Sequence, residues 1–267
     1  MGDVSRALND LARHQTITRL YADILADMAV CDIEGWDKLE YLMELSKIID
    51  HFIGGEQSMA KKKPDDTEYN FRAIITDSLM KTGREGMIDF IQYLDDIGYF
   101  TAPCSGGNHL CKVGGLAEHS VNVMWAAEKI SVGLIGGKNI TDEFRNSIII
   151  AALLHDLGKV GDYGKPMYVE NILKSGKASE AKPFKQNKDL TAVPHAVRSV
   201  KLATLYLDLT EDEEWAILTH NGLYDTFMRY DIPGNESPLS MIIHWADMWA
   251  SRVMEEPDNS NEKESEG

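Results

Sequence analysis

Four histidines and two aspartates in this sequence are residue types that bind divalent metal ions. A neutral imidazole donates a nitrogen lone pair, and a carboxylate supplies a negatively charged oxygen. A single inward histidine is usually a hydrogen-bonded core residue, whereas six polar groups that all point inward from separate helices indicate a metal centre. The six candidates are His119, His155, Asp156, His195, His220 and Asp247.

The first candidate ligand needs a helix that turns it toward the core. Leu116, Val123 and Ile130 recur at helical spacing and predict a helix over 116–130 with one apolar face. His119 lies on that same face, so we expect its imidazole to point inward.

The pair His155 and Asp156 follows an apolar helix that is expected to end at Leu154. Two adjacent polar groups at the end of such a helix need partners, because burial without partners is costly. Lys159 follows four residues after His155 and is expected to lie near the pair.

Two further helices carry the other histidines. Pro194 suits the first turn of a helix and places His195 at the positive N-terminal end. Thr210 and Glu213 have the spacing of a capping box for the next helix, which carries His220.

Asp247 belongs to an apolar stripe on the last helix, where an unpaired carboxylate would be costly. The stripe is formed by Leu239, Ile243, Ala246, Ala250 and Met254. We therefore expect Asp247 to have a partner inside the fold.

Three local strings resemble the HD superfamily of metal-dependent phosphohydrolases. They are Gly-Gly-Leu-Ala-Glu-His-Ser at 114–120, Leu-Leu-His-Asp-Leu-Gly-Lys at 153–159 and Trp-Ala-Asp at 245–247. The resemblance covers roughly residues 83–254, and the stretch 83–119 is similar to HD-domain hydrolases of bacteria and their prophages. It implies a bundle of helices that holds one or two metal ions.

The same resemblance, extended to the six-ligand branch of the superfamily, implies two divalent ions with Asp156 between them. One ion would be bound by His119, His155, Asp156 and Asp247, and the other by Asp156, His195 and His220. Imidazole and carboxylate suit manganese, iron, zinc, nickel and cobalt alike, so the metal stays open.

The activity that the resemblance implies is a metal-dependent phosphohydrolase, either a phosphodiesterase or a nucleotidase, acting on a nucleotide or short oligonucleotide. Metal-activated hydroxide would attack phosphorus, with Asp156 and Lys159 as the catalytic residues. Lys159 would also stabilise charge on the phosphoryl oxygens. Arg198, His109 and Lys112 are further candidates for substrate contact.

Two alternatives from other classes stay open. Mixed-valence di-iron oxygenases of the same superfamily share the ligand order His, His-Asp, His, His, Asp, and Lys159 does not exclude them. The second alternative is a non-catalytic HD module that binds a nucleotide, although such a module would not need six costly polar ligands.

Charge is distributed unevenly along the 267 residues, whose net charge is -16. This balance argues against stable binding to duplex nucleic acid through its phosphate backbone. Between Lys159 and Lys201, by contrast, nine basic residues face four acidic ones. We expect this stretch to attract a small phosphorylated substrate.

The sequence predicts an all-α fold in three parts: an N-terminal helical appendage and linker over 1–70, an HD metal-dependent phosphohydrolase domain over 71–254, and a disordered acidic tail over 255–267. A short hairpin arm is expected near Pro166–Leu173. Three cysteines cannot form a disulfide framework and the N-terminus has no apolar signal core, so we expect a cytoplasmic protein with no membrane partner. The oligomeric state stays open.

Overall fold

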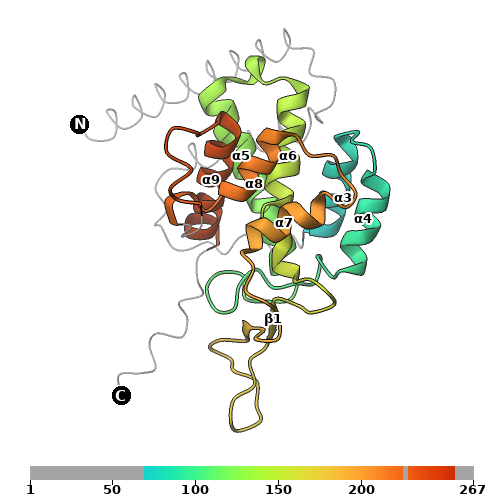
Figure 1. The fold of residues 1–267 in the computed structure, drawn as a ribbon, viewed down its shortest axis with the longest axis vertical. Helices are drawn as coiled ribbons and strands as arrows, with labels where there is room; N and C mark the ends of the chain where they lie inside the picture. The colour runs from blue at the N-terminus through green and yellow to red at the C-terminus, as the bar shows by residue number, and fades with distance from the viewer. Residues whose placement is uncertain (1–68, 225–227, 256–267) are drawn as a thin grey trace, which may run out of the picture. The chain divides into compact units, whose positions relative to one another are not determined.

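The computed structural model describes residues 69–224 and 228–255. Within these ranges the fold is all-α apart from one two-stranded hairpin, which confirms the predicted fold class (Figure 1). Residues 1–68 of the predicted appendage and the acidic tail beyond residue 255 lie outside the described residues. No helix in these ranges is long and apolar enough to cross a membrane.

The labelled elements follow one another as α-helices, short 3-10 turns (η1 to η3), one π-helical turn (η4) and two strands. Their bounds are α3 Phe71–Lys81, α4 Met87–Asp96, α5 Gly115–Ile135, η1 Gly137–Asn139, α6 Asp142–Leu154, η2 Leu157–Val160, β1 Tyr168–Glu170, β2 Phe184–Gln186, α7 His195–Ala203, α8 Glu211–Thr219, η3 Gly222–Tyr224, α9 Pro238–Trp249 and η4 Ala250–Met254.

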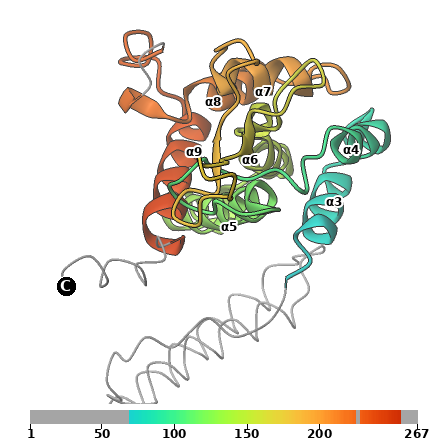
Figure 2. The ribbon, with the colours of Figure 1, turned by 90° about the horizontal axis from the view of Figure 1, so that it is seen from below.

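The core lies where α5, α6, α8 and α9 meet. Helix α5 packs against both α6 and α9, and α8 packs against α6 and α9 (Figure 2). Ile150, Leu153 and Leu154 of α6 are 0% exposed, and each such side chain stabilises the fold by about 1.5–3 kcal/mol. Because this core borders the end of α6 and the inner faces of α5 and α9, its packing fixes the candidate ligands on those helices.

Helices α6 and α8, which each end at a candidate ligand, both begin with a threonine N-cap. The Thr141 side chain accepts a hydrogen bond from the backbone at the start of α6, and His155 is the C-cap of that helix. Thr210 and Glu213 form the capping box of α8, as predicted, and His220 is its C-cap. These caps satisfy backbone N–H groups of the first turn and fix where each helix starts.

The capping residue Glu213 also belongs to a buried ion pair. Its carboxylate, 0% exposed, accepts hydrogen bonds from the Arg84 guanidinium at 3.0 and 2.8 Å, from Ser147 Oγ at 2.8 Å and from the Thr210 backbone N–H at 2.9 Å. The same guanidinium donates to the Asp208 carbonyl at 2.6 Å. This network joins the segment before α4 to α6 and α8.

Replacing Glu213 with alanine is expected to lower the free energy of unfolding by about 3–5 kcal/mol, because it leaves the Arg84 charge without its buried partner. Urea denaturation followed by circular dichroism measures the change. The control is Glu211→Ala, an exposed acid in the first turn of the same helix, for which the loss should stay below about 1 kcal/mol. Equal losses in the two variants would contradict the role of the buried pair.

The hairpin arm, formed by β1, β2 and the residues that join and flank them, is longer than the sequence predicted. Strand β1 pairs antiparallel with β2, with Tyr168 opposite Gln186 and Glu170 opposite Phe184. The whole hairpin was expected near Pro166–Leu173, but only its first strand lies there. The second strand was missed because lysines interrupt its apolar pattern. In Figure 1 this arm projects from the helical body below α7.

A π-helical turn, η4, ends the last helix. The backbone N–H of Glu255 donates to the Ala250 carbonyl at 2.9 Å, a bond across five residues. Met254 was expected on the inward stripe, four residues after Ala250. This prediction was wrong, because the wider turn rotates the next residue inward. Met254 is 42% exposed, and Glu255, assigned to the tail, is 6% exposed.

Candidate metal centre

The structure brings the six candidate ligands together from five helices. His119 comes from α5, His155 and Asp156 from the end of α6, His195 from the first residue of α7, His220 from the end of α8 and Asp247 from α9. Four of them are at most 1% exposed, whereas the side chains of His195 and Asp247 are 24% and 19% exposed. The cluster therefore opens to solvent on the side of these two residues.

One set of donor atoms gathers around the Asp156 Oδ2 atom. It lies 3.4 Å from His119 Nε2 and 3.3 Å from His155 Nε2. The two Nε2 atoms are 3.2 Å apart, and Asp247 Oδ1 lies 3.2 Å from His119 Nε2. Four side chains thus direct one donor atom each toward a common point.

A second set gathers around the other carboxylate oxygen. Asp156 Oδ1 lies 3.1 Å from His195 Nε2 and 3.6 Å from His220 Nε2, and the two imidazole nitrogens are 3.1 Å apart. Each oxygen of Asp156 therefore faces a different group of imidazoles.

Helix ends fix which nitrogen of two histidines faces the cluster. His155 Nδ1 donates to the Ala152 carbonyl at 2.8 Å, and His220 Nδ1 donates to the Ile217 carbonyl at 2.7 Å. Each bond satisfies a carbonyl that the last turn of a helix leaves without a partner. Because Nδ1 carries the proton, Nε2 keeps its lone pair and can bind a metal.

His119 is oriented by a residue that the sequence analysis did not select. The Glu255 carboxylate lies 3.0 Å from His119 Nδ1 through both oxygens and accepts a hydrogen bond from Asn122 Nδ2 at 2.9 Å. Glu255 begins an acidic stretch of the sequence, and residues in such a stretch are expected to be exposed. Its burial could therefore not be predicted from its neighbours. A carboxylate on the far nitrogen of a ligand imidazole fixes the ring and increases its basicity.

The approach of α7 depends on a glycine beside the His155–Asp156 pair. A Cβ atom at Gly158 would lie 2.1 Å from the His195 carbonyl oxygen, so only glycine allows this contact. Ser199 Oγ accepts from the Gly158 backbone at 2.8 Å and donates to the His155 carbonyl at 2.8 Å. These contacts hold the start of α7, with His195, against the end of α6.

The donor set fits divalent metal ions. Ligand atoms about 2.0–2.2 Å from one ion lie roughly 3.0–3.5 Å from each other, close to the separations within both sets. In addition, Asp156 Oδ1 is buried without a hydrogen-bond donor among the described residues. Lone pairs that face one another in a buried site repel unless a cation lies between them.

The protonation preferences of the cluster also favour a cation. Burial opposes the charge of Asp156, yet Lys159 and His155 hold its pKa well below the usual range. Burial likewise opposes a charge on His119, but Cys104 and the carboxylates of Asp156, Asp247 and Glu255 hold its pKa well above the usual range. Burial and the His155 imidazole lower the pKa of His220 to about 3, so that ring is neutral.

Lys159 lies at the edge of the cluster. Its Nζ is 2.5 Å from Asp156 Oδ2, and its side chain is 13% exposed. Burial opposes its charge, but Asp156 keeps the pKa of Lys159 well above the ordinary value. The positively charged ammonium group of Lys159 therefore lies beside Asp156, the carboxylate that both donor sets share.

The three other predicted substrate contacts lie in different places. Lys112 is exposed and pairs with Glu118 at 2.6 Å. The His109 ring centre lies 5.1 Å from that of His119, on the Glu255 side. His109 thus lies beside His119, one of the donors around Asp156, whereas Lys112 has no described contact with those donors.

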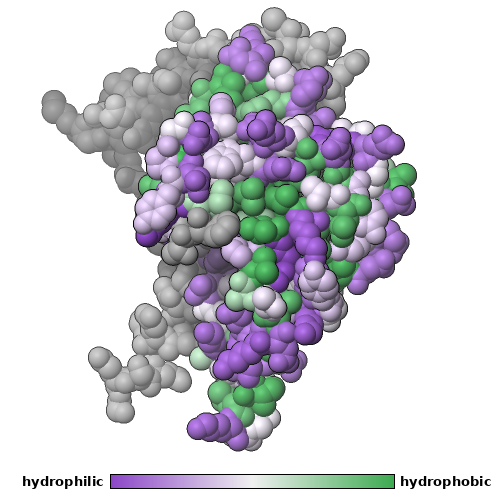
Figure 3. Space-filling model, viewed as in Figure 1, coloured by the Kyte–Doolittle hydropathy of each residue, from purple (hydrophilic) through white to green (hydrophobic). Residues whose placement is uncertain are grey.

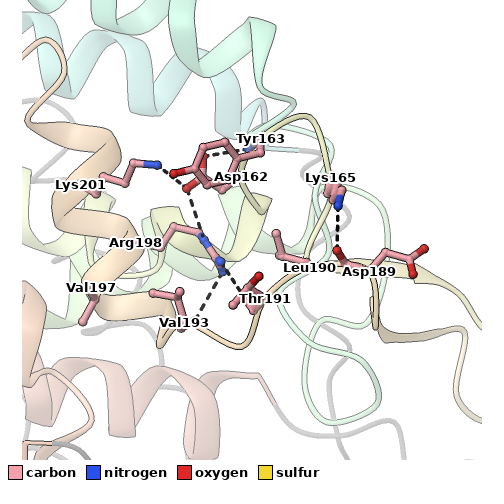
Figure 4. Close-up of a pocket in the computed structure, with 10 residues that line it drawn as sticks. All are labelled: Asp162, Tyr163, Lys165, Asp189, Leu190, Thr191, Val193, Val197, Arg198 and Lys201. Atoms are coloured by element: carbon pink, nitrogen blue, oxygen red, sulfur yellow. Dashed lines mark hydrogen bonds and ion pairs between the residues drawn. The ribbon is translucent and has the colours of Figure 1, made fainter.

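Arg198 points away from the cluster, and Figure 4 shows its contacts. The buried guanidinium donates to the Thr191 carbonyl at 3.0 Å and the Val193 carbonyl at 3.4 Å, and its Nε lies 3.7 Å from Asp162 Oδ2. It borders a pocket of about 240 Å³ whose lining includes none of the six candidate ligands. Arg198 thus supports the segment that leads into His195.

One comparison with known proteins gives a match. A family model described as HD domain matches residues 116–250, half of the chain, and this span contains all six candidate ligands. No curated protein and no solved structure matches the chain.

Proposed function

Because the chain belongs to the HD domain family, whose members are generally metal-dependent phosphohydrolases, we propose that it hydrolyses a phosphate ester of a nucleotide or short oligonucleotide. A phosphodiester is favoured over a monoester, because two-metal centres stabilise both the attacking and the leaving oxygen. The proposal includes the roles of the site residues, with the six candidate ligands holding metal ions and Lys159 contacting the phosphate.

The observation that carries the proposal is the double contact of Asp156. Its Oδ2 faces His119 and His155, while its Oδ1 faces His195 and His220. We assign each oxygen to a different divalent ion. Two such ions carry four positive charges and the two aspartates remove two, so the centre keeps a positive charge that suits a phosphate.

The chain's own groups then have separate tasks. The chemistry that divalent ions would supply, when held by these residues, is a water molecule of lowered pKa and the polarisation of a phosphoryl oxygen. His195 and Asp247, the two partly exposed ligands, border the path by which a phosphate reaches the centre. Lys159 keeps a positive charge near the phosphoryl oxygens, where negative charge increases during the reaction.

The hairpin arm supports an anionic substrate. Its six lysines are all exposed: Lys165, Lys174, Lys177, Lys182, Lys185 and Lys188. Figure 3 shows a mainly hydrophilic arm with apolar residues toward its end. Ile172 and Leu173, in the connection between β1 and β2, are 45% and 48% exposed. In a chain of net charge -16, this local positive charge raises the concentration of phosphate compounds near the centre.

The double variant Lys182→Glu, Lys185→Glu is expected to lower kcat/KM about tenfold at low salt, mainly through KM, with a smaller effect at high salt. Steady-state kinetics at two ionic strengths measures both effects. The matched control is Lys129→Glu, Lys138→Glu, which makes the same charge change at exposed positions of α5 and the following turn. If both double variants lose the same activity, the arm has no specific role.

A hydrolysis panel tests the proposal. It contains mononucleotides, nucleoside triphosphates, cyclic dinucleotides and short single-stranded oligonucleotides, with manganese added and products separated by anion exchange. Cleavage by the wild type and not by Asp156→Ala supports a phosphohydrolase, and the position of the product phosphate separates a diesterase from a nucleotidase. Absence of cleavage across the panel, with metal bound, contradicts the proposal. Oxygen consumption by the iron-loaded chain then tests the oxygenase alternative.

A further inference from the structure

A thiol, an imidazole and a carboxylate lie close together beside the His119 ring. Cys104 Sγ lies 3.3 Å from His109 Nε2, and His109 Nε2 lies 3.7 Å from Glu255 Oε2. The Glu255 carboxylate faces the Nδ1 side of His119, whereas the donors around Asp156 face its Nε2 side. None of Cys104, His109 and Glu255 is one of the six candidate ligands. The group is therefore adjacent to the candidate metal centre but separate from it.

Burial and backbone geometry hold this group in place. Cys104 is 0% exposed, and the side chains of Glu255 and His109 are 2% and 18% exposed. The loop from Cys104 to Leu110 is closed by a backbone hydrogen bond of 3.3 Å between its ends and by a bond of 2.8 Å from Ser105 Oγ to the His109 carbonyl. Leu110 adopts a φ of 44°, a left-handed conformation that is unusual for leucine.

The remaining contacts leave suitable atoms available. Both Glu255 oxygens lie 3.0 Å from His119 Nδ1. Oε1 also accepts from Asn122 at 2.9 Å, whereas Oε2, 3.7 Å from His109 Nε2, keeps a lone pair for an ion. Burial raises the pKa of the Cys104 thiol, and Lys159 Nζ, 3.6 Å from Cys104 Sγ, acts in the opposite direction. A divalent ion bound to the sulfur would displace the thiol proton.

We propose that Cys104, His109 and Glu255 form an additional metal-binding position for a zinc-like divalent ion. In tetrahedral zinc sites with the usual bond lengths, sulfur and nitrogen ligands lie roughly 3.5 Å apart, close to the separation of Cys104 and His109. A thiolate with an imidazole selects zinc or cobalt over magnesium and manganese, which prefer oxygen ligands. Three protein ligands leave the fourth position to water.

Occupancy of this position is coupled to the main centre through Glu255. An ion on Oε2 restrains the carboxylate whose oxygens contact His119 Nδ1, and this restraint orients the ring that presents Nε2 to Asp156. The coupling predicts that the main centre binds metal more weakly when the additional position is empty.

Cobalt spectroscopy tests the site directly, because only a thiolate ligand produces an intense near-ultraviolet sulfur-to-cobalt band. The full chain carrying Cys31→Ser and Cys111→Ser keeps Cys104 as its single cysteine. This chain, stripped of metal by a chelator, is titrated with Co²⁺. We expect the sulfur band to appear, and we expect Cys104→Ser and His109→Ala each to lose the band together with one bound ion per chain.

Two results would overturn the site: absence of the sulfur band at saturating Co²⁺, or unchanged metal content in His109→Ala. His109→Ala keeps the buried thiol, so it remains informative if Cys104→Ser fails to fold. Asp156→Ala in the same single-cysteine chain should retain the band. Failure of the proposed hydrolase and failure of this site are therefore distinguished.

Discussion

Replacing Asp156 with alanine is expected to remove both ions from the main centre and to lower kcat/KM by at least about 1,000-fold, a loss of several kcal/mol of transition-state stabilisation. The reason is geometric: Oδ2 lies 3.3 Å from His155 Nε2, and Oδ1 lies 3.1 Å from His195 Nε2. No other candidate ligand contributes donor atoms to both sets. Elemental analysis of the purified chain, together with steady-state kinetics, measures the two effects.

The matched control for this variant is Asp142→Ala, an exposed acid in the first turn of the same helix. It should keep full metal content and activity. Asp156→Asn adds a graded test, because an amide offers only one carbonyl oxygen and so can serve only one donor set. Equal metal content in the wild type and in Asp156→Ala would refute the assignment of Asp156 as a shared ligand.

His195→Ala is expected to remove mainly one ion while the other remains, with a fall in kcat of about 100-fold or more. His195 contacts only the Oδ1 set, where its Nε2 is 3.1 Å from His220 Nε2. The donors around Oδ2 remain complete in this variant. Metal content per chain, measured alongside thermal unfolding, separates loss of one ion from loss of the fold.

The mirror variant His119→Ala should remove mainly the ion on the Oδ2 side. Each variant is thus the control for the other, because each leaves the opposite donor set complete. If both variants lost both ions, the two positions would not be independent, and the model of two separately bound ions would be wrong.

Helical periodicity made much of this centre predictable from the sequence. The spacing of Leu116, Val123 and Ile130 depends only on the geometry of one helix, and His119 is buried as that spacing predicted. The Thr210–Glu213 capping box likewise follows from local chemistry and is present in the structure. Local rules of this kind give the direction of a side chain, so several inward histidines could be identified without knowledge of the fold.

Contacts between distant segments could not be predicted in the same way. Glu255 reaches His119 because a π-helical turn replaces the last α-helical turn. No residue pattern in this segment predicts such a turn. Arg198 lies one turn after His195, but it binds the backbone of Thr191 and Val193. Its direction depends on how the preceding segment packs, which sequence spacing does not determine.

The two histidines at helix C-caps have a consequence for chain length. His155 and His220 each donate to a carbonyl three residues earlier in their own helix. The position of each ligand therefore depends on the number of residues in its helix. Inserting one residue into α6 or α8 would rotate the ligand by about 100° around the helix axis and advance it by about 1.5 Å. The exposed arm between β1 and β2 carries no such constraint, so insertions and deletions between related sequences should accumulate there and be rare within these two helices.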